Sequence, residues 1–468
     1  MFFDSRLTAN SFDLFDTLVA RRAIAPRRVF EDIERSLGAS GFATARIAAE
    51  QTLMQRGEAF DLHDIYREIV ARGQCSLETA EKLKAGEIDA EFDHAIPIME
   101  NLARVREFDL VVSDMYLPVD ILRRLLQHVG LRLFVHIFVS NAGKHFGTIW
   151  PQLGERWLIQ RHLGDNLHAD VAGPQAHGIA TEHFTGAQPS QAEQLLLQHG
   201  QFELAGISRA LRLRNPYPVS SSEAQMWLLY AQLNLPLLCL TASAVRHTQL
   251  SHGCSKLLFS ARDAYFLSEL FSLLYPTIPA DYLHVSRRTL WQHRDDVDVL
   301  LDRLDASDAL VVDLVSTGHS WYRFTEAKAR AIDFFSVIQI DHHQPVFTSL
   351  EELAASRYLR FSSLIRNSEL GDYSNAIEVL NTALHGSAVA LASSGGWVVP
   401  VMGSEHELPL QLLNALVAAH AAAMEMVRRG RTRLLEELPR EPSRPMLQTL
   451  LRTISVQPLL IELGKKVI

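Results

Sequence analysis

The feature that most constrains the fold is a repeated alternation of short apolar runs with helical segments. The runs FDLVVSDMY (108–116), FVHIFVS (134–140) and WLIQRHLGDN (157–166) are strand-like, and each ends in polar residues. Segments with helical periodicity follow them at 119–129, after Gly147 and at 170–178. Because parallel strands need a long crossover that a helix usually provides, this alternation predicts a parallel sheet covered by helices on both faces.

The same alternation begins again after the polar stretch PYPVSSS (216–222). It includes the strand-like runs SKLLFS (255–260), DYLHVS (281–286) and ALVVDLV (309–315), and then FFSVIQI (334–340) and WVVPVM (397–402) before a helix-rich tail. A chain of 468 residues is also longer than one hydrophobic core usually supports. We therefore expect an α/β protein with two Rossmann-like parallel-sheet domains, at 1–190 and 223–468, joined by a linker at 191–222.

A helical insertion separates the first apolar run from the second. Residues 22–98 contain four amphipathic segments with Gly or Pro between them: APRRVFEDIERSL, FATARIAAEQTLMQRG, LHDIYREIVARG and LETAEKLKAGEIDAEF. This pattern predicts a compact helical insertion in the first domain.

The composition narrows the classes of function. A formal net charge of -9 argues against a nucleic-acid binder that works by neutralising phosphates. Three distant cysteines without CxxC spacing suggest neither a disulfide framework nor a thiolate zinc site, and the N-terminus lacks a signal-peptide pattern. The most apolar segment, 226–245, is interrupted by polar residues and Pro236, so we expect a buried, kinked helix and no membrane span. These features favour a cytoplasmic protein that acts on small molecules.

Polar residues suited to phosphate chemistry follow the strands of the first domain. Asp13 follows the first apolar run, Ser113 and Lys144 follow the next two, and Asp165 and Asp170 follow the fourth. Open parallel sheets bind ligands at the carboxyl ends of their strands. A carboxylate that attacks phosphorus needs a cation and donors for the phosphoryl oxygens, and Mg²⁺ prefers oxygen ligands. These residues therefore predict a Mg²⁺-assisted phosphoryl site.

These residues lie in four motifs that resemble those of the haloacid dehalogenase superfamily. The motifs are FDLFDTL, VVSD, Lys144 within SNAGKHFG, and GDNLHAD, in family order over roughly residues 8–185. The resemblance implies a hydrolase core whose C1 cap is the helical insertion, with Asp13 as the nucleophile. The catalytic set that it implies is Asp13, Asp16, Ser113 and Lys144, and its Mg²⁺ site lies at Asp13, Phe15, Asp165 and Asp170.

One position of the first motif departs from the family pattern. The family carries its general acid and base two residues after the nucleophile, where this chain has Phe15, and Asp16 follows one step later. Residues three apart on a strand face opposite sides, so Asp16 replaces the acid only if the chain turns sharply there. Three alternatives follow: protonation by Asp16 or a cap residue, a substrate with a good leaving group such as an acyl phosphate or a pyrophosphate, or ligand binding without turnover.

The most informative stretch of the second domain is ALVVDLVSTGHS (309–320). A strand ends in an acid, and a Ser-Thr-Gly loop runs into a helix whose N-terminus offers donors to a phosphate. The stretch resembles the ribose-5-phosphate loop of type I phosphoribosyltransferases, and KLLFSARDAYFL resembles, less closely, their pyrophosphate loop; the resemblance covers about residues 220–340. Val312 replaces the first acid of the family's pair, and SARD (260–263) lacks its small glycine pair.

Charged residues near the strand ends of this domain suggest an anion pocket beside Asp313. Arg262, Asp263, Arg287 and Arg288 form either such a pocket or a surface ion-pair cluster. The substrate-binding residues that we expect are Arg262, Asp263, Arg287, Asp313, Ser316, Thr317, Gly318 and Ser320.

Together the two resemblances suggest a Mg²⁺-dependent phosphohydrolase joined to a phosphoribosyl-binding or transferring domain. The expected ligand is a phosphorylated sugar or nucleotide, such as phosphoribosyl pyrophosphate. The pairing is also similar to predicted hydrolases of the same superfamily from bacterial polysaccharide-biosynthesis loci. The alternative is a catalytically degenerate protein that binds phosphorylated ligands as a sensor or in an assembly.

Overall fold

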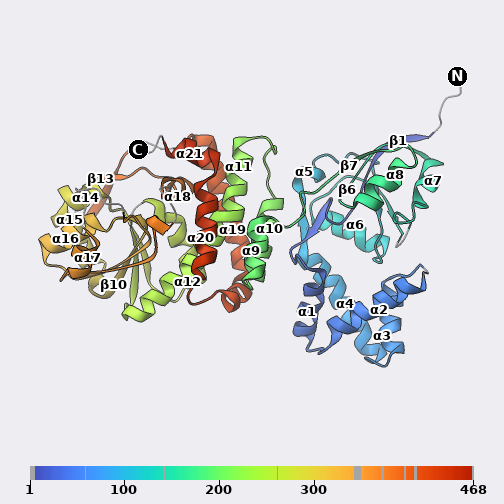
Figure 1. Cartoon of the computed structure of the whole chain (residues 1–468), viewed down its shortest axis with the longest axis horizontal. Helices are drawn as coiled ribbons and strands as arrows, with labels where there is room; N and C mark the ends of the chain where they lie inside the picture. Colours follow the sequence, from blue (N-terminus) through green and yellow to red (C-terminus); the bar gives the residue numbers. More distant parts are fainter. Residues whose placement is uncertain are drawn as a thin grey trace, which may run out of the picture. The chain divides into compact units, whose positions relative to one another are not determined.

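The structure is a computed structural model that describes residues 6–57, 59–140, 143–260, 262–341, 349–369, 374–394, 397–404 and 408–465. The chain divides into two compact units, the first made of 1–189 with 213–216 and the second of 190–212 with 217–468. Each unit contains one five-stranded sheet with helices packed around it (Figure 1). The expected α/β class with two Rossmann-like sheets is confirmed.

The sheet of the first unit has the strand order β5-β4-β1-β6-β7, and its neighbouring strands are parallel. The chain builds outward from β1 through β4 and β5, and then on the other side through β6 and β7. The carboxyl ends of β1 and β6 therefore border the crevice where the winding reverses, which is the usual ligand site of such sheets. The strands are β1 (Leu7–Phe12), β4 (Leu110–Ser113), β5 (His136–Val139), β6 (Trp157–Gly164) and β7 (Ala180–His183).

Large apolar side chains fix this sheet against its helices. Leu110 and Val112 of β4 are fully buried and pack with Trp150, Trp157 and Ile159. The expected helix at 170–178 is instead a π-helical turn, Leu167–Ala172, followed by a short helix that contains Pro174. The helices of this part are α5 (Met99–Leu102), α6 (Val119–His128), α7 (Ile149–Gly154) and α8 (Gly173–Gln175).

The insertion forms a helical cap, as expected, and a two-stranded ribbon joins it to the core. In the ribbon, β2 (Val19–Arg21) pairs antiparallel with β3 (Ala95–Pro97). Asp61 and Asp64 form a capping box at the third cap helix, and Ser76 caps the fourth. The four helices form a group of their own in Figure 1: α1 (Pro26–Leu37), α2 (Phe42–Arg56), α3 (Leu62–Ala71) and α4 (Leu77–His94).

A buried ion pair lies at the centre of the cap. The Arg46 guanidinium donates to both oxygens of Glu87 at 2.8 Å, and neither side chain is exposed. The Tyr66 hydroxyl donates to Glu87 at 2.7 Å, and the ring of Tyr116 lies 4.7 Å from the Arg46 guanidinium carbon. Since Tyr116 follows β4 in the core, this cluster attaches the cap to the loop beside the sheet.

Residues 191–222, expected to be a linker, are largely helical, and all of them except 213–216 belong to the second unit. They form α9 (Gln191–Gln198) and α10 (Phe202–Leu213), whose apolar faces bury Leu196, Leu204 and Leu211. The side-chain amide of Gln201 donates to the carbonyl of Glu437 in α19 (Leu410–Glu437) at 3.0 Å. The expectation was wrong because it gave the Pro- and Ser-rich stretch at 216–222 more weight than the helical periodicity before it.

The sheet of the second unit has the strand order β12-β11-β10-β8-β9, again with parallel neighbours. Its winding reverses between β8 and β10, so the carboxyl ends of these two strands border the crevice. The strands are β8 (Lys256–Ser260), β9 (Ala280–Leu283), β10 (Ala309–Ser316), β11 (Ile332–Gln339) and β12 (Leu359–Arg366). The helices that follow its strands are α13 (Tyr265–Leu274), α14 (Arg287–Gln292), α15 (Arg294–Arg303), α16 (His319–Lys328) and α17 (Leu350–Ala355).

The most apolar helix of the chain is α11 (Ser222–Leu229) continued into α12 (Leu235–His252) through a π-helical turn at Tyr230–Asn234. Pro236 lies in the first turn of α12, next to this irregularity. Among the described residues, this helix and α19 are long and apolar enough to cross a membrane, and 83% and 44% of their most apolar windows are buried. The first of them is thus a core helix of the second unit.

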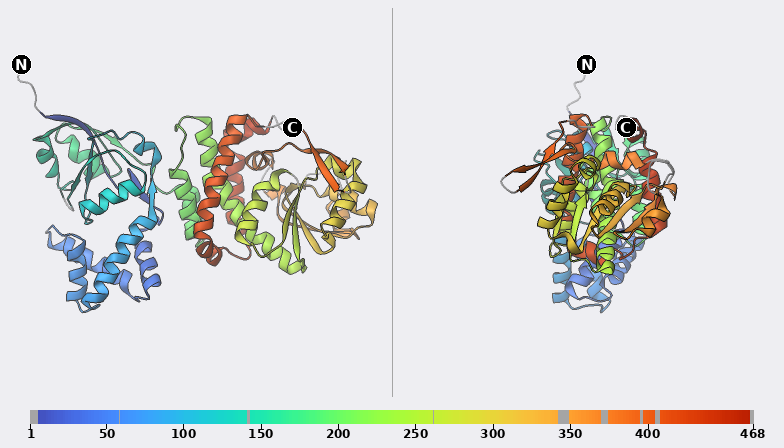
Figure 2. Two further views of the ribbon diagram at one scale, coloured as in Figure 1. Left: turned by 180° about the vertical axis from the view of Figure 1, so that it is seen from behind. Right: turned by 90° about the vertical axis from the view of Figure 1, so that its left-hand side faces the viewer.

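Further helices and a hairpin complete the second unit. The helices are α18 (Ser374–Leu380), α20 (Arg444–Ser455) and α21 (Pro458–Gly464). The antiparallel hairpin of β13 (Ala388–Ser394) and β14 (Trp397–Met402) extends away from the body of this unit in the right-hand view of Figure 2.

Candidate functional site

Three carboxyl groups meet at the crevice of the first sheet. Asp13 follows β1 and its backbone N–H donates to Leu163 of β6 at 2.8 Å. Asp165 follows β6, and Asp170 lies in the π-helical turn. Each of the three acids offers a carboxylate oxygen within 4.8 Å of the other two. Such an all-oxygen donor set fits a hard divalent cation such as Mg²⁺.

The expected lysine lies inside this acid cluster. The Lys144 ammonium group forms an ion pair with Asp13, a second with Asp170 at 2.6 Å, and a hydrogen bond to the carbonyl of Val112 at 3.1 Å. The loop that carries it is held by Asp114, whose carboxylate accepts from the backbone N–H groups of Lys144 and His145 at 2.9 and 2.8 Å. Asp114 of the second motif therefore positions the third motif.

A buried histidine supports Asp170 from behind, and the sequence analysis did not identify it. Nε2 of His162 lies 3.2 Å from Asp170, and Nδ1 lies 2.8 Å from the hydroxyl of Ser11. Burial lowers the pKa of His162, so the ring is neutral at physiological pH. Since Asp170 only accepts when ionised, Nε2 carries the proton and Ser11 donates to Nδ1. The sequence did not single out Ser11 or His162, because β1 and β6 contain other polar residues such as Asn10, Gln160 and Arg161.

Burial and like charges raise two of the carboxyl pKa values. Burial raises the pKa of Asp13 to about 7; Lys144 opposes the shift and Asp170 adds to it. Burial, then the charge of Asp16, raises the pKa of Asp165 to about 6. Burial alone would also raise the pKa of Asp170, but the His162 hydrogen bond and the Lys144 charge lower it to about 2. A divalent cation would offset both the burial and the like charges that keep the pKa values of Asp13 and Asp165 high.

A glycine at the end of β6 allows the backbone to approach Asp170 closely. A Cβ atom at Gly164 would lie 2.3 Å from the Asp170 side chain, which cannot move because His162 and Lys144 hold it. Ser113 is buried at the end of β4, the strand that pairs with β1. Ser113 thus ends the strand beside β1, which Asp13 follows. This is the position that the order of the motifs predicts.

The stretch around Phe15 turns sharply. Asp16 has a left-handed φ of 54°, and its N–H donates to the carbonyl of Val19 at 2.7 Å. The Phe15 ring supports Arg21, whose guanidinium carbon lies 4.0 Å from the ring centroid and which pairs with Glu91 of α4 at 2.8 Å. Phe15 offers no side-chain atom to a metal. The turn brings the charge of Asp16 close enough to Asp165 to affect its pKa.

The second crevice contains a cavity of about 480 Å³. Every expected substrate-binding residue lines it except Gly318, which instead begins α16 with a φ of 74°. A Cβ atom there would lie 2.7 Å from the ring of Phe361, so only glycine fits without a shift. Ala261, between Ser260 and Arg262, lies outside the described residues. The cavity wall also includes Tyr282, His284, Glu378 and His385, which the sequence did not single out.

Two carboxyl groups of this cavity come from neighbouring strand ends. Asp263 follows β8 and accepts a hydrogen bond from the backbone N–H of Val315 at 3.1 Å. Burial, then the charge of Asp263, raises the pKa of Asp313 well above its usual range. Among the described residues, Oδ1 of Asp313 has no hydrogen-bond partner although it is buried. A buried carboxyl oxygen without a hydrogen-bond partner lowers the stability of the folded state unless a ligand pairs with it.

No protein-family model matches this chain, and a search of curated proteins finds no match either.

Proposed function

We propose that the first unit is a Mg²⁺-dependent phosphohydrolase that works through an aspartyl-phosphate on Asp13. The observation that supports this most is the cluster of Asp13, Asp165 and Asp170 around the Lys144 ammonium at the crevice of the sheet. A nucleophilic carboxylate, an oxygen-rich cation site and a buried ammonium are the parts that phosphoryl transfer requires.

Each residue has a defined task in this reaction. The Asp13 carboxylate attacks phosphorus while the bond to the leaving oxygen breaks, and water later attacks the acyl phosphate to release inorganic phosphate. Lys144 and Ser113 hold the phosphoryl oxygens, and Lys144 also keeps Asp13 and Asp170 in place. A Mg²⁺ ion held by Asp13, Asp165 and Asp170 would withdraw charge from the phosphoryl oxygens.

The leaving oxygen receives its proton from Asp16 or departs as a stable anion. Phe15 cannot donate a proton, and its ring is engaged by Arg21. Asp16 follows Phe15 in the sharp turn. Its negative charge lies close enough to Asp165 to raise the pKa of that carboxyl group. If Asp16 donates, Asp16→Asn slows phosphomonoesters of alcohols by about 10²–10⁴-fold and leaves acyl phosphates unchanged. If neither class slows, Asp16 is not the proton donor, which leaves a cap residue or a substrate with a good leaving group.

Phosphate release tests the proposal directly. The protein is incubated with Mg²⁺ and a panel of phosphomonoesters, acyl phosphates and nucleotides, beside Asp13→Asn and the exposed control Asp120→Asn. We expect release by the unsubstituted chain and the control only, with a hydroxylamine-sensitive phosphoryl group on the peptide that contains Asp13. Equal background rates for all three proteins on every substrate would leave the ligand-binding alternative in place.

We also propose that the second unit binds a phosphorylated sugar or nucleotide in the cavity at β8 and β10. Support comes from the loop 316–318 at the start of α16 and from Arg287 across the cavity. Calorimetric titration with ribose 5-phosphate tests this, with Ser316→Ala and Arg287→Ala expected to weaken binding. Absence of heat at millimolar ligand would refute it.

A further inference from the structure

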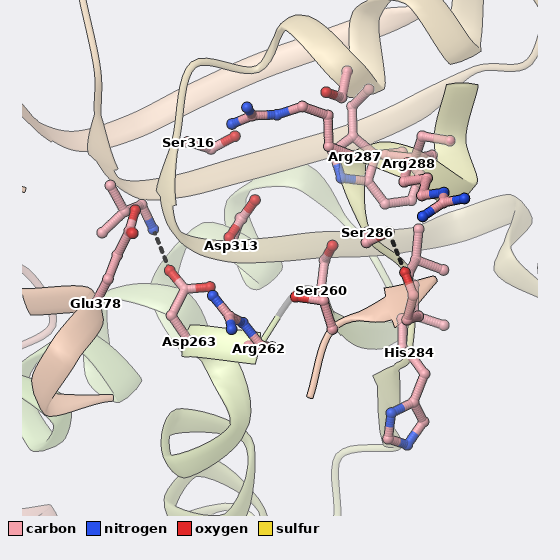
Figure 3. A pocket seen from close by; sticks show the side chains of 18 of the residues that line it. Ser260, Arg262, Asp263, His284, Ser286, Arg287, Arg288, Asp313, Ser316 and Glu378 are labelled. Carbon is pink, nitrogen blue, oxygen red and sulfur yellow. Dashed lines mark hydrogen bonds between the residues drawn. The ribbon is translucent and has the colours of Figure 1, made fainter. Parts of the chain in front are cut away.

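The cavity of the second unit carries opposite charges at its two ends. In Figure 3 the Arg287 side chain extends toward Ser316, and Asp313 lies between that pair and Asp263. Glu378 of α18 also lines the acidic end, and its charge contributes to the raised pKa of Asp313. The cavity therefore joins an anion-binding end to an end rich in carboxyl groups.

The anion-binding end is built on the start of α16. Gly318 begins this helix in the left-handed conformation, and its N–H donates to the Ser316 hydroxyl at 3.1 Å. The N–H of His319 donates to the Thr317 hydroxyl at 3.2 Å. A single phosphate can replace these weak local bonds with its own oxygens and pair with Arg287.

The acidic end is built for a ligand that brings donors. The side chain of Asp313 is nine-tenths buried, and its Oδ1 has no hydrogen-bond partner among the described residues. Asp263 is fixed across the crevice by the N–H of Val315. Hydroxyl groups can donate to ionised acids and accept from a protonated one, so an acid pair that holds one proton suits them.

We propose that this cavity selects a phosphomonoester with free hydroxyl groups and rejects diphosphates. The phosphate lies at Ser316–Ser320 with Arg287, and the hydroxyls meet Asp313 and Asp263. This inference rests on the proposed function of the second unit. It departs from the expectation of a phosphoribosyl pyrophosphate site.

Electrostatics makes the acidic end unsuitable for a second anion. A second phosphate at the acidic end would lie next to Asp263, Asp313 and Glu378, which line the cavity there. Arg262 is a cation beside them, and, since the pair of Asp313 and Asp263 shares one proton, it balances one of the two remaining negative charges at most. Like charges in a partly desolvated cavity repel each other far more than in water.

Paired titrations test the selectivity. All proteins carry Asp13→Asn so that the first unit turns over neither ligand, and ribose 5-phosphate and phosphoribosyl pyrophosphate are titrated in Mg²⁺ buffer. We expect the monophosphate to bind at least tenfold more tightly. Asp263→Asn keeps an oxygen that accepts from Val315 and removes the charge, so it should reduce that ratio at least fivefold by tightening the diphosphate. Arg287→Ala should weaken the monophosphate at least fivefold, which places the binding in this cavity.

The outcomes separate the inference from the function on which it rests. If both ligands bind equally, or the diphosphate binds more tightly, the selectivity is wrong although the cavity still binds sugar phosphates. If neither binds and circular dichroism shows a folded protein, the proposed function of the second unit fails and the inference fails with it. A ratio unchanged in Asp263→Asn would show that its charge is not the cause.

Discussion

The two crevices of this protein hold buried carboxyl groups in different electrostatic states. At the first, Lys144 and His162 each contact Asp170, and Lys144 also contacts Asp13. At the second, Asp263 and Asp313 face each other and Oδ1 of Asp313 lacks a partner among the described residues. Both sheets reverse their winding at these crevices. The topology therefore determines where each site lies, and the side chains determine its chemistry.

In our proposals, a small cation completes the first site and an organic ligand completes the second. The first crevice already holds its positive group and its supporting hydrogen bonds. The second crevice buries Oδ1 of Asp313 without a hydrogen-bond partner among the described residues, and a hydroxyl-bearing ligand would relieve that cost to stability. Substitutions at matching places in the two crevices should therefore change stability in opposite directions.

The largest effect is expected from Lys144→Met, which removes the ammonium group but keeps the volume of the chain. Asp13 and Asp170 would then be buried without their cation, so the first unit should lose about 3–5 kcal/mol of unfolding free energy. Urea unfolding followed by hydrogen exchange in peptides of residues 7–183 measures this. Lys82→Met, which removes only an exposed pair with Glu78, is the control and should cost about 0.5 kcal/mol or less. Equal losses in both variants would contradict the assigned role of Lys144.

Replacing His162 should loosen the cation site of the first crevice. His162→Gln cannot keep both the Asp170 and Ser11 contacts, so Mg²⁺ affinity should fall about 10–100-fold. Calorimetry with Mg²⁺ alone measures this without turnover. Ser11→Ala leaves the ring in place and should give a smaller loss. Unchanged affinity in a folded His162→Gln protein would show that Asp170 needs no such support.

Removing the charge at the second crevice should stabilise the protein. Because the pKa of Asp313 is raised in the folded state, that state binds the proton more tightly than the unfolded chain, and stability falls as pH rises above the usual aspartate pKa. Asp313→Asn should therefore add about 1–3 kcal/mol at pH 8, with a gain that fades toward pH 4. Thermal unfolding at both pH values measures the difference. A loss at pH 8 would mean that Asp313 is paired in solution.

The smallest expected effects concern the two left-handed residues of the crevices. Gly318→Ala should cost about 1–2 kcal/mol, because alanine tolerates that backbone poorly and its methyl group meets Phe361. Asp16→Gly should change stability by no more than about 0.5 kcal/mol, because aspartate accepts this conformation and glycine costs unfolded-state entropy. Chemical denaturation of the two variants compares them. A larger loss of unfolding free energy in Asp16→Gly than in Gly318→Ala would contradict this prediction.

Much of the fold followed from the pattern of the sequence. Buried parallel strands appear in the sequence as continuous apolar runs. The polar residues at their ends predicted where Asp13, Lys144 and Asp313 lie. The strands that were not predicted lie at sheet edges, in the ribbon of β2 and β3, or in the hairpin. In β7 (ATEH) the sequence is short and half exposed, and β12 (LRFSSLIR) mixes exposed and buried positions, so neither forms an apolar run.

The missed site residues depend on strand register, which one sequence does not reveal. Ser11 and His162 are direct neighbours across β1 and β6 although 151 residues separate them. Arg21 reaches Phe15 and Glu91 because the ribbon brings it back past the first motif. Glu378 and His385 reach the second cavity from segments with no strand-end signal. Local sequence patterns assign residues to helices and strands. Only the pairing of the strands shows which residues are neighbours in space.

The ribbon of β2 and β3 makes the helical insertion a separable part of the first unit. Its two strands leave and re-enter the core side by side, with Arg21 opposite Ala95 and the N–H of Arg22 bonded to the carbonyl of His94 at 2.8 Å. A tight turn could bridge this gap, so the whole helical insertion is an exchangeable module that can be deleted or replaced without breaking the sheet. One contiguous segment can therefore be exchanged while Asp13, Asp165 and Asp170, which all lie outside it, keep their places in the core.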